Sequence, residues 1–343
     1  MKQLLNTLFV MTEGSYVHID HDNVLVDIEK KTALRVPIQH LSGLSVFGNV
    51  MVSPMTISRF AQEGRGMAFF SRTGRFQARV QGSVSGNVLL RVAQFEALKQ
   101  IPKPAEISRN IVAAKIQNSR QILMRSARES ENNNESKQLR EVANSLSPLL
   151  NKLSEADDLD SIRGLEGISA KNYFSVFQYM IRNERDVFPF TKRSRRPPLD
   201  RTNALMSFLY SMLLNDCVSA LEGVGLDPQI GYLHALRPGR PALGLDLMEE
   251  LRTVISDRLA LALMNRKQIQ KDDFEERSGG AVMLNEAGRK KVVVAYQKRK
   301  QEEITHPVLE NKVSFGLLPH IQASLFARYL RQDIPVYQPF LLR

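Results

Sequence analysis

Three acidic residues and one histidine with metal-ligand chemistry lie in apolar stretches of the second half of the chain. Glu166 stands in Leu-Glu-Gly-Ile, and His234 ends the run Gly-Tyr-Leu-His. Asp246 and Glu249 are three residues apart, so they share one face of a predicted helix. Carboxylates with an imidazole suit a hard divalent ion such as Mg²⁺ or Mn²⁺. The spacing therefore indicates a candidate metal site.

Each of these residues also has an ordinary structural explanation, which the sequence leaves open. Acids on helices often pair with nearby bases, and a lone histidine is often a hydrogen-bonded core residue. The alternatives are an ion pair of Glu166 with Arg163 or Lys171, a core role for His234, a helix cap at Asp246, and an ion pair of Glu249 with Arg252 or Arg258.

Two basic segments lie between Glu166 and Asp246 in the sequence. Arg193, Arg195 and Arg196 precede a Pro-Pro pair, which keeps this segment out of a helix. Arg237 and Arg240 lie in a Pro- and Gly-containing loop between the histidine and the two-acid helix. Arginine recognises phosphate oxygens well, so we predict that these five residues bind the backbone of a nucleic acid.

Composition narrows the class of protein. The 343 residues carry 47 Lys and Arg against 36 Asp and Glu, a net charge of +11, which favours a polyanionic partner. Cys217 is the only cysteine, so a disulfide framework and a cysteine zinc site within one chain are excluded. No Gly-rich phosphate loop ending in Lys-Ser or Lys-Thr occurs. We expect a cytoplasmic protein with no membrane anchor.

The elements that must position these residues change character along the chain. Short Val-, Ile- and Tyr-rich runs separated by turn residues predict strands in the first part, and Ser53 followed by Pro54 predicts the start of one helix, 53–63. The strands are expected at 7–11, 16–20, 23–29, 33–38, 43–47, 66–70 and 76–80.

After Gly86, apolar residues recur at spacings of three and four, which is typical of helices. Helices are expected at 88–100, 105–128, 137–154, 161–182, 201–221, 243–264, 286–303 and 318–331. The polar run 129–136 is expected to be a loop, and 272–276 a solvated turn. The predicted fold class is α+β: a strand-rich N-terminal domain, residues 1–85, followed by a larger all-α catalytic domain, residues 86–343.

A series of motifs, in this order, resembles the CRISPR-associated adaptation integrases, a family of metal-dependent DNA endonucleases. The resemblance spans nearly the whole chain, and the Pro-Pro-Leu-Asp-Arg-Thr-Asn stretch is similar to the type I-C branch. The motifs are RGLEG at 163–167 with Tyr173-Phe174, RPPLDRTNAL at 196–205, GLDP at 225–228, GYLH at 231–234, LDLMEE at 245–250, Asp273-Phe274, VML at 282–284 and GRK at 288–290.

The resemblance implies a role for each matching residue. Glu166, His234 and Glu249 match the family's metal ligands, and Asp246 matches an acid of the catalytic centre. Tyr173 and Asn203 match residues that line the site, and Arg252 the family's usual arginine. The family's frequent Phe-Arg-Pro is Leu-Arg-Thr here, which lets that helix continue.

The activity that the resemblance implies is joining of 3′-hydroxyl ends of spacer-precursor DNA to a CRISPR array by transesterification. The implied partners are double-stranded and branched DNA, a second copy of the chain bound through the strand-rich domain, and a small ferredoxin-like adaptation protein. A non-catalytic scaffold that binds nucleic acid would explain the charge equally well, and this alternative stays open.

Overall fold

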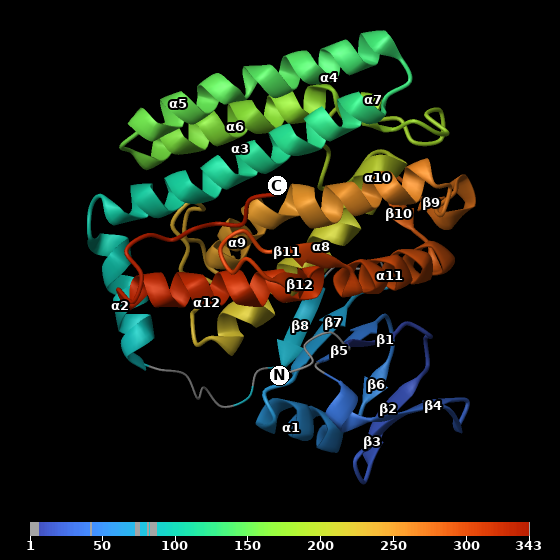
Figure 1. Cartoon of the computed structure of the whole chain (residues 1–343). Helices are drawn as coiled ribbons and strands as arrows, with labels where there is room; N and C mark the ends of the chain where they lie inside the picture. Colours follow the sequence, from blue (N-terminus) through green and yellow to red (C-terminus); the bar gives the residue numbers. More distant parts are fainter. Residues whose placement is uncertain (1–6, 42, 73–75, 81, 83–87, 343) are drawn as a thin grey trace.

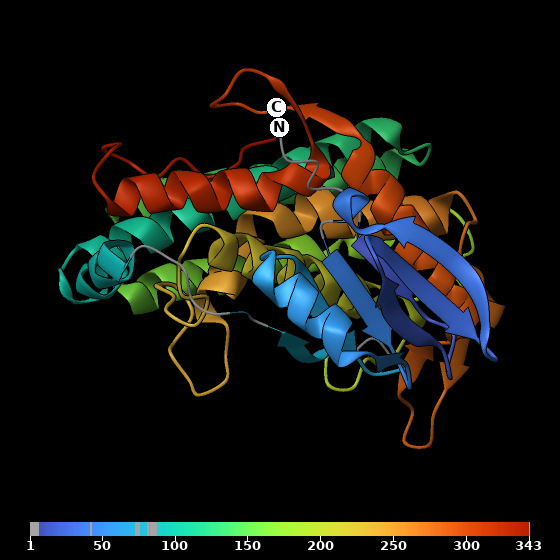
Figure 2. The same cartoon turned by 90° about the horizontal axis from the view of Figure 1, so that it is seen from below.

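The computed structural model describes residues 7–41, 43–72, 76–80, 82 and 88–342. Its N-terminal part contains two four-stranded sheets (Figures 1 and 2). In the first sheet, of order β1-β5-β7-β8, only the last pair is antiparallel; in the second, of order β4-β3-β2-β6, only β2 and β6 are parallel. The strands are β1 (Thr7–Val10), β2 (Tyr16–Asp20), β3 (Asn23–Ile28), β4 (Lys31–Pro37), β5 (Gly43–Phe47), β6 (Met51–Val52), β7 (Gly66–Phe70) and β8 (Phe76–Val80).

Helix α1 (Pro54–Gln62) begins where the sequence predicts it. The Ser53 hydroxyl accepts a hydrogen bond from the backbone N–H of Thr56 at 3.1 Å, and Pro54 occupies the first turn, where its missing N–H costs nothing. Phe60 is fully buried with valines of both sheets, so α1 helps to close the core between them.

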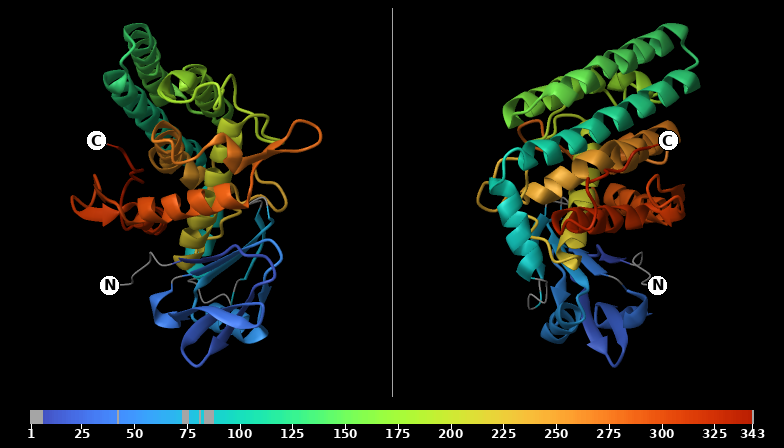
Figure 3. Two further views of the ribbon diagram at one scale, coloured as in Figure 1. Left: turned by 90° about the vertical axis from the view of Figure 1, so that its right-hand side faces the viewer. Right: turned by 60° about the vertical axis from the view of Figure 1, so that its left-hand side comes forward.

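The rest of the chain is mostly helical, which confirms the predicted α+β class. The long α3 supports a layer of α4, α5 and α6, while α8 passes through the centre against α9 and α12 (Figures 1 and 3). The helices are α2 (Val88–Lys99), α3 (Lys103–Glu129), α4 (Asn133–Ser145), α5 (Ser147–Glu155), α6 (Leu159–Ser175), α7 (Phe177–Met180), α8 (Arg201–Gly223), α9 (Ala242–Arg252), α10 (Arg258–Asn265), α11 (Glu286–Gln301) and α12 (Leu318–Leu330).

Several predicted boundaries are wrong. The expected loop at 129–136 is largely helix, because the Asn132 side chain caps α4 by accepting from two backbone N–H groups. The helix expected at 137–154 is interrupted at Leu146, before a proline in the first turn of α5. Between α9 and α10 the chain forms a π-helical turn, Thr253–Asp257.

Two small hairpins lie among the helices, and of these only the segment 279–284 is expected from the sequence to be extended. The expected turn at 272–276 includes β9 (Phe274–Glu276), which pairs antiparallel with β10 (Val282–Leu284). A second hairpin joins β11 (Glu303–Thr305) to β12 (Lys312–Ser314). The three-residue strands β11 and β12 carry too little periodicity to be found from the sequence.

The two parts of the chain share buried contacts. Phe47 of β5 stacks on Phe70 and packs against Phe208 of α8, with ring centroids 4.8 and 6.2 Å apart. The predicted domain boundary at 85/86 lies outside the described residues, so that division stays a prediction. Helix α8 is apolar and long enough to cross a membrane by length and composition, yet 61% of that window is buried inside the protein, as in a core helix.

Candidate metal and phosphate site

The predicted metal ligands Glu166 and Glu249 come together around a buried lysine. Lys115 of α3 forms ion pairs with Glu166 of α6 and with Glu249 of α9, the latter at 2.8 Å. The Lys115 side chain is only 5% exposed and that of Glu249 only 3%, whereas Glu166 is 27% exposed. A cationic group therefore lies between the two carboxylates, at the inner end of a site that opens towards Glu166.

His234 joins this group from the loop before α9, and Asp246 fixes its orientation. The His234 Nδ1 lies 2.7 Å from Asp246 Oδ1, and the same carboxylate accepts the backbone N–H groups of residues 232, 233 and 234 at 2.6 to 3.1 Å. A carboxylate partner at Nδ1 favours the proton there, which leaves Nε2 as the nitrogen with a free lone pair. That Nε2 lies 3.8 Å from Glu249 Oε1.

The close approach of this loop to α9 requires a glycine. A Cβ atom on Gly231 would lie 2.5 Å from the backbone carbon of Ala242 and 2.7 Å from Asp246 Oδ2. Arg163 of α6 holds the other side of the loop, since its Nε donates to the carbonyl of Leu233 at 2.7 Å. The GYLH motif is thus a tightly anchored loop whose last residue faces the acids.

Electrostatics keep Glu249 ionised although it is buried. Burial alone would raise its pKa, but the charges of Arg252 and Lys115 outweigh burial and hold the pKa below the ordinary glutamate range. Arg252 donates to Oε1 at 2.6 Å, whereas Oε2 forms no hydrogen bond within the described part of the chain and is compensated by the charge of Lys115.

The side chains around Lys115 offer donor atoms of the kind that a divalent ion binds. Two carboxylates, one of them with a buried oxygen that lacks a hydrogen bond, and an imidazole with a free Nε2 are a suitable donor set for Mg²⁺ or Mn²⁺. As the side chains stand, no three His, Cys, Asp or Glu residues among those described are close enough to hold an ion. The chemistry fits if the Lys115 ammonium gives way.

A second buried cluster, formed around Tyr210 and Asp257, adjoins the site through Arg252. Tyr210 of α8 donates a hydrogen bond to Asp257 at 2.6 Å, and the guanidinium groups of Arg193 and Arg252 lie 5.1 and 4.9 Å from its ring centroid. Burial raises the pKa of Asp257 to about 6. Arg193 also donates a hydrogen bond to the Asn203 side chain at 2.6 Å. Its side chain thus points inward, and its contact with DNA stays a prediction.

The other predicted phosphate-binding residues lie at the surface. Arg195, Arg196 and Arg237 are exposed, and Arg240 is half-buried. Partial burial and the positive charges of Arg237, Arg195 and Arg163 lower the pKa of Arg240. The two basic segments, which are separate in the sequence, therefore lie close enough for their charges to interact beside the His234 loop.

Sequence reasoning missed Lys115, although a signal was present. It is a lone charged residue in the apolar run Val-Ala-Ala-Lys-Ile of a predicted helix, where a base needs a buried acid as partner. Of the structural alternatives, the Glu249–Arg252 pair is present, and Glu166 pairs with Lys115 rather than with Arg163 or Lys171. Tyr173 is buried near Asp257 rather than open to ligand.

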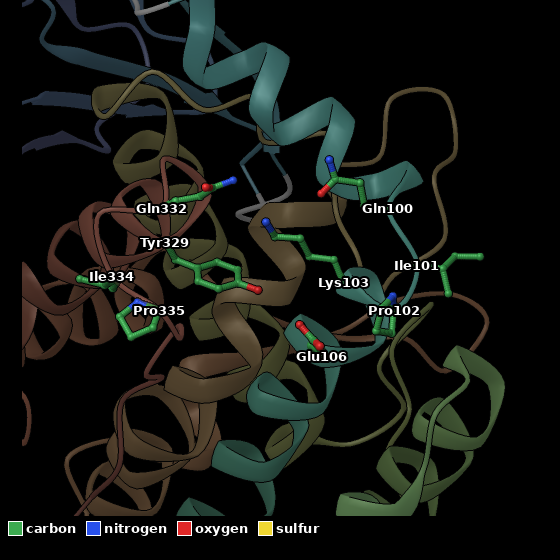
Figure 4. Close-up of a pocket in the computed structure, with 9 residues that line it drawn as sticks. All are labelled: Gln100, Ile101, Pro102, Lys103, Glu106, Tyr329, Gln332, Ile334 and Pro335. Carbon is green, nitrogen blue, oxygen red and sulfur yellow. The ribbon is translucent and has the colours of Figure 1, made fainter.

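A separate pocket of about 370 Å³ lies between the start of α3 and the end of α12 (Figure 4). Lys103, Glu106 and Tyr329 line it, and the Lys103 ammonium is 5.3 Å from the tyrosine ring centroid. None of the predicted site residues belongs to it. This pocket is therefore separate from the candidate metal site around Lys115.

Comparison with known proteins identifies the family. A family model described as CRISPR associated protein Cas1 matches residues 8–298. A CRISPR-associated endonuclease Cas1 of Moorella thermoacetica is 53% identical over 343 residues, covering 100% of both chains. A solved CAS1 protein from Thermotoga maritima superposes with a TM-score of 0.82 at 26% identity, covering 98% of this chain and 100% of that one. A casposase bound to integration product shares the fold, with a TM-score of 0.83 at 20% identity and coverage of 97% and 93%.

These matches confirm the resemblance that the motifs carry. The type I-C assignment and the cytoplasmic location stay predictions, because none of the matches bears on them. The match of the family model over most of the chain, together with full-length identity above one half to a curated relative, shows that the chain belongs to the Cas1 family of CRISPR-associated proteins.

Proposed function

We propose that this protein is a metal-dependent DNA endonuclease and integrase of CRISPR adaptation, with Glu166, His234 and Glu249 as the metal ligands. The observation that carries the proposal is the convergence of two carboxylates and one oriented imidazole around a cation position now held by Lys115. Family membership and the endonuclease names of the curated relatives support the same class of activity.

The reaction is displacement at a phosphodiester. In the integrase mode, a DNA 3′-hydroxyl forms the new phosphorus–oxygen bond while a 3′ oxygen of the target strand leaves; in the nuclease mode, water is the nucleophile. A bound Mg²⁺ or Mn²⁺ would polarise the phosphoryl oxygens and offset the charge that develops on them.

The chain's own residues bind and orient the substrate. Arg195, Arg196, Arg237 and Arg240 offer guanidinium groups to phosphates at the edge of the site, which gives binding that weakens steeply with salt. The Asp246 carboxylate is engaged by the backbone of the loop and by His234. We therefore assign Asp246, which the sequence groups with the catalytic residues as an acid that supports the site, a positioning role.

We further propose a homodimer through the strand-rich part and an assembly with a small ferredoxin-like adaptation protein. Exposed apolar side chains on this part support the first proposal: Leu34, Met51 and Met55 are 43, 61 and 73% exposed. The strand β4 is an open edge of its sheet, which offers unpaired backbone groups to a partner.

The decisive experiment measures cleavage and strand joining on branched and short duplex DNA, with Mn²⁺ or with EDTA. Glu166→Ala, His234→Ala and Glu249→Ala should each abolish metal-dependent reaction while DNA is still retained. Glu155→Ala, an exposed acid at the end of α5, is the matched control and should react normally. Activity that survives in the three variants would refute the assignment, and no reaction by the intact protein with its small partner would favour a non-catalytic scaffold.

A further inference from the structure

Four arginines from three helices line a pocket on another face of the molecule. Arg125 and Arg128 lie near the end of α3, Arg258 begins α10, and Arg299 lies in the last turn of α11. The pocket has a volume of about 340 Å³. In Figure 1, α10 lies between α3 and α11, which brings the three helices together. We call this group the arginine pocket.

The positive charges in the arginine pocket are incompletely compensated. Burial and the charges of Arg299 and Arg125 lower the pKa of Arg258 to about 10. Within the described part of the chain, Arg258 has neither a hydrogen bond nor an ion pair. The acids that line the pocket are Glu302 and Glu303, and Glu302 is already paired with Arg299. Arg125 is paired with Glu129 at 2.8 Å, and the charges of Glu129 and Glu302 only partly offset the effects that lower the pKa of Arg258. Arg258 is therefore a cation of this pocket that pairs directly with no described acid.

Arg299, which is paired with Glu302, is held in a fixed position. The guanidinium of Arg299 stacks on Phe315, 3.8 Å from the ring centroid, and its Nη2 donates to the carbonyl of Val254 at 3.4 Å. Its Nε is buried and forms no hydrogen bond with any described residue. A planar guanidinium fixed by stacking loses little side-chain freedom when it binds an oxyanion, so the geometry favours phosphate recognition.

We propose that the arginine pocket binds a phosphate group, either from a DNA backbone or from a free phosphoanion. The two sources present the same tetrahedral oxyanion, and Arg258 and Arg299 are its main partners. A phosphate would supply the negative charge that Glu302 and Glu303 do not, and would relieve the repulsion that lowers the pKa of Arg258. The proposal does not rest on the catalytic site, since no residue is shared.

The test uses the full chain in EDTA, so that no metal at the catalytic centre can recruit the anion. Inorganic pyrophosphate is titrated by calorimetry, and a short duplex DNA is titrated over a range of salt concentrations. The variants are Arg258→Gln and Arg299→Gln, with Lys137→Gln as the charge-matched control on the exposed face of α4. Arg240→Gln reports any pyrophosphate that binds at the basic loop instead.

We expect Arg258→Gln and Arg299→Gln to weaken pyrophosphate binding about tenfold or more, the loss typical of one charge-assisted hydrogen bond. Lys137→Gln should leave that binding unchanged, and any loss in Arg240→Gln measures the share of pyrophosphate that binds at the basic loop. If DNA is the source, the same variants also reduce the slope of log affinity against log salt by about one, and pyrophosphate competes with DNA. If a free anion is the source, DNA binding is unaffected.

Equal binding of both probes by Arg258→Gln, Arg299→Gln and Lys137→Gln would overturn the proposal. Arg258→Gln removes a charge that lacks a partner, so thermal melting should show a fold at least as stable as the parent. If either of the two variants fails to fold, Arg125→Gln decides the question, because the Arg125 side chain lines the same pocket, is 53% exposed and pairs with Glu129 on its own helix.

Discussion

Replacing Lys115 by methionine should destabilise the metal-free protein and strengthen its binding of Mn²⁺. The Lys115 Nζ lies 2.8 Å from Glu249 Oε2, and the two side chains are 5 and 3% exposed. Removing one partner of a buried ion pair costs about 3–5 kcal/mol because the other charge is left uncompensated. Glu249 keeps Arg252 at 2.6 Å, so we expect the lower end, about 3 kcal/mol.

The second half of the prediction follows from competition. An ion that binds Glu166 and Glu249 must displace the ammonium of Lys115, which contacts both carboxylates. In Lys115→Met this competitor is gone and the two carboxylates repel each other, so a divalent ion gains more by binding. Urea unfolding without metal should show the loss, and the rise in melting temperature on adding Mn²⁺ should exceed that of the parent protein.

Lys152→Met, at an exposed position on α5, is the matched control and should change neither quantity. Methionine preserves the packing of the aliphatic stem, so a loss of stability reports the charge rather than a cavity. The reasoning is wrong if Lys115→Met unfolds within about 1 kcal/mol of the parent, well below the ~3 kcal/mol expected. Weaker binding of Mn²⁺ would instead mean that the lysine holds the ligands in place rather than competing for them.

Three further substitutions test other parts of the site. Burial raises the pKa of Glu250 to about 7, so the folded chain binds a proton that the unfolded chain releases, and the free energy of unfolding falls as pH rises from about 4.5 to 7. Glu250→Gln should remove roughly 3 kcal/mol of this pH dependence in urea unfolding. Parallel pH profiles of the variant and the parent would contradict this. Asp246→Asn should weaken Mn²⁺ binding 10–100-fold in calorimetry while DNA binding is retained, because His234 loses the carboxylate that orients its ring; unchanged affinity would refute the positioning role. Gly231→Ala should cost about 1–3 kcal/mol in urea unfolding, whereas Gly164→Ala, where a Cβ meets nothing within 4 Å, should not; equal stabilities would mean that the loop tolerates the added atom.

The sequence was sufficient to predict most helices and strands and to mark several residues of the candidate site, though not Lys115. Ser53 and Pro54 predicted the start of α1, and the apolar surroundings of Glu166, His234 and Glu249 marked them as unusual for a solvated face. These signals are local, since a cap or an acid in an apolar run is visible within a few residues. The π-helical turn after α9 and the hairpin of β11 and β12 were not predictable, because their hydrogen bonds depend on tertiary partners.

What joins the site residues is not local. Lys115 contacts Glu166, which lies 51 residues further along the chain, and Glu249, which lies further still. No spacing rule predicts such a pairing. The same holds for Asp246, whose sequence position suggested a helix cap. In the structure its carboxylate instead binds the backbone of the preceding loop, which a residue at Gly231 with a side chain would push away.

Charge density along the sequence is a poor guide to which bases meet phosphate. Arg193 and Arg195 are two residues apart in one basic run, yet Arg193 turns inward over Tyr210, next to Asp257, whereas Arg195 remains exposed. The inward guanidinium offsets the charge of a buried acid and so supports the candidate metal site. Arg258, by contrast, forms no ion pair with a described acid, and the charges of Glu129 and Glu302 only partly offset the repulsion from Arg299 and Arg125. We infer that this difference, rather than the number of arginines nearby, distinguishes a base that stabilises the fold from one that binds a ligand.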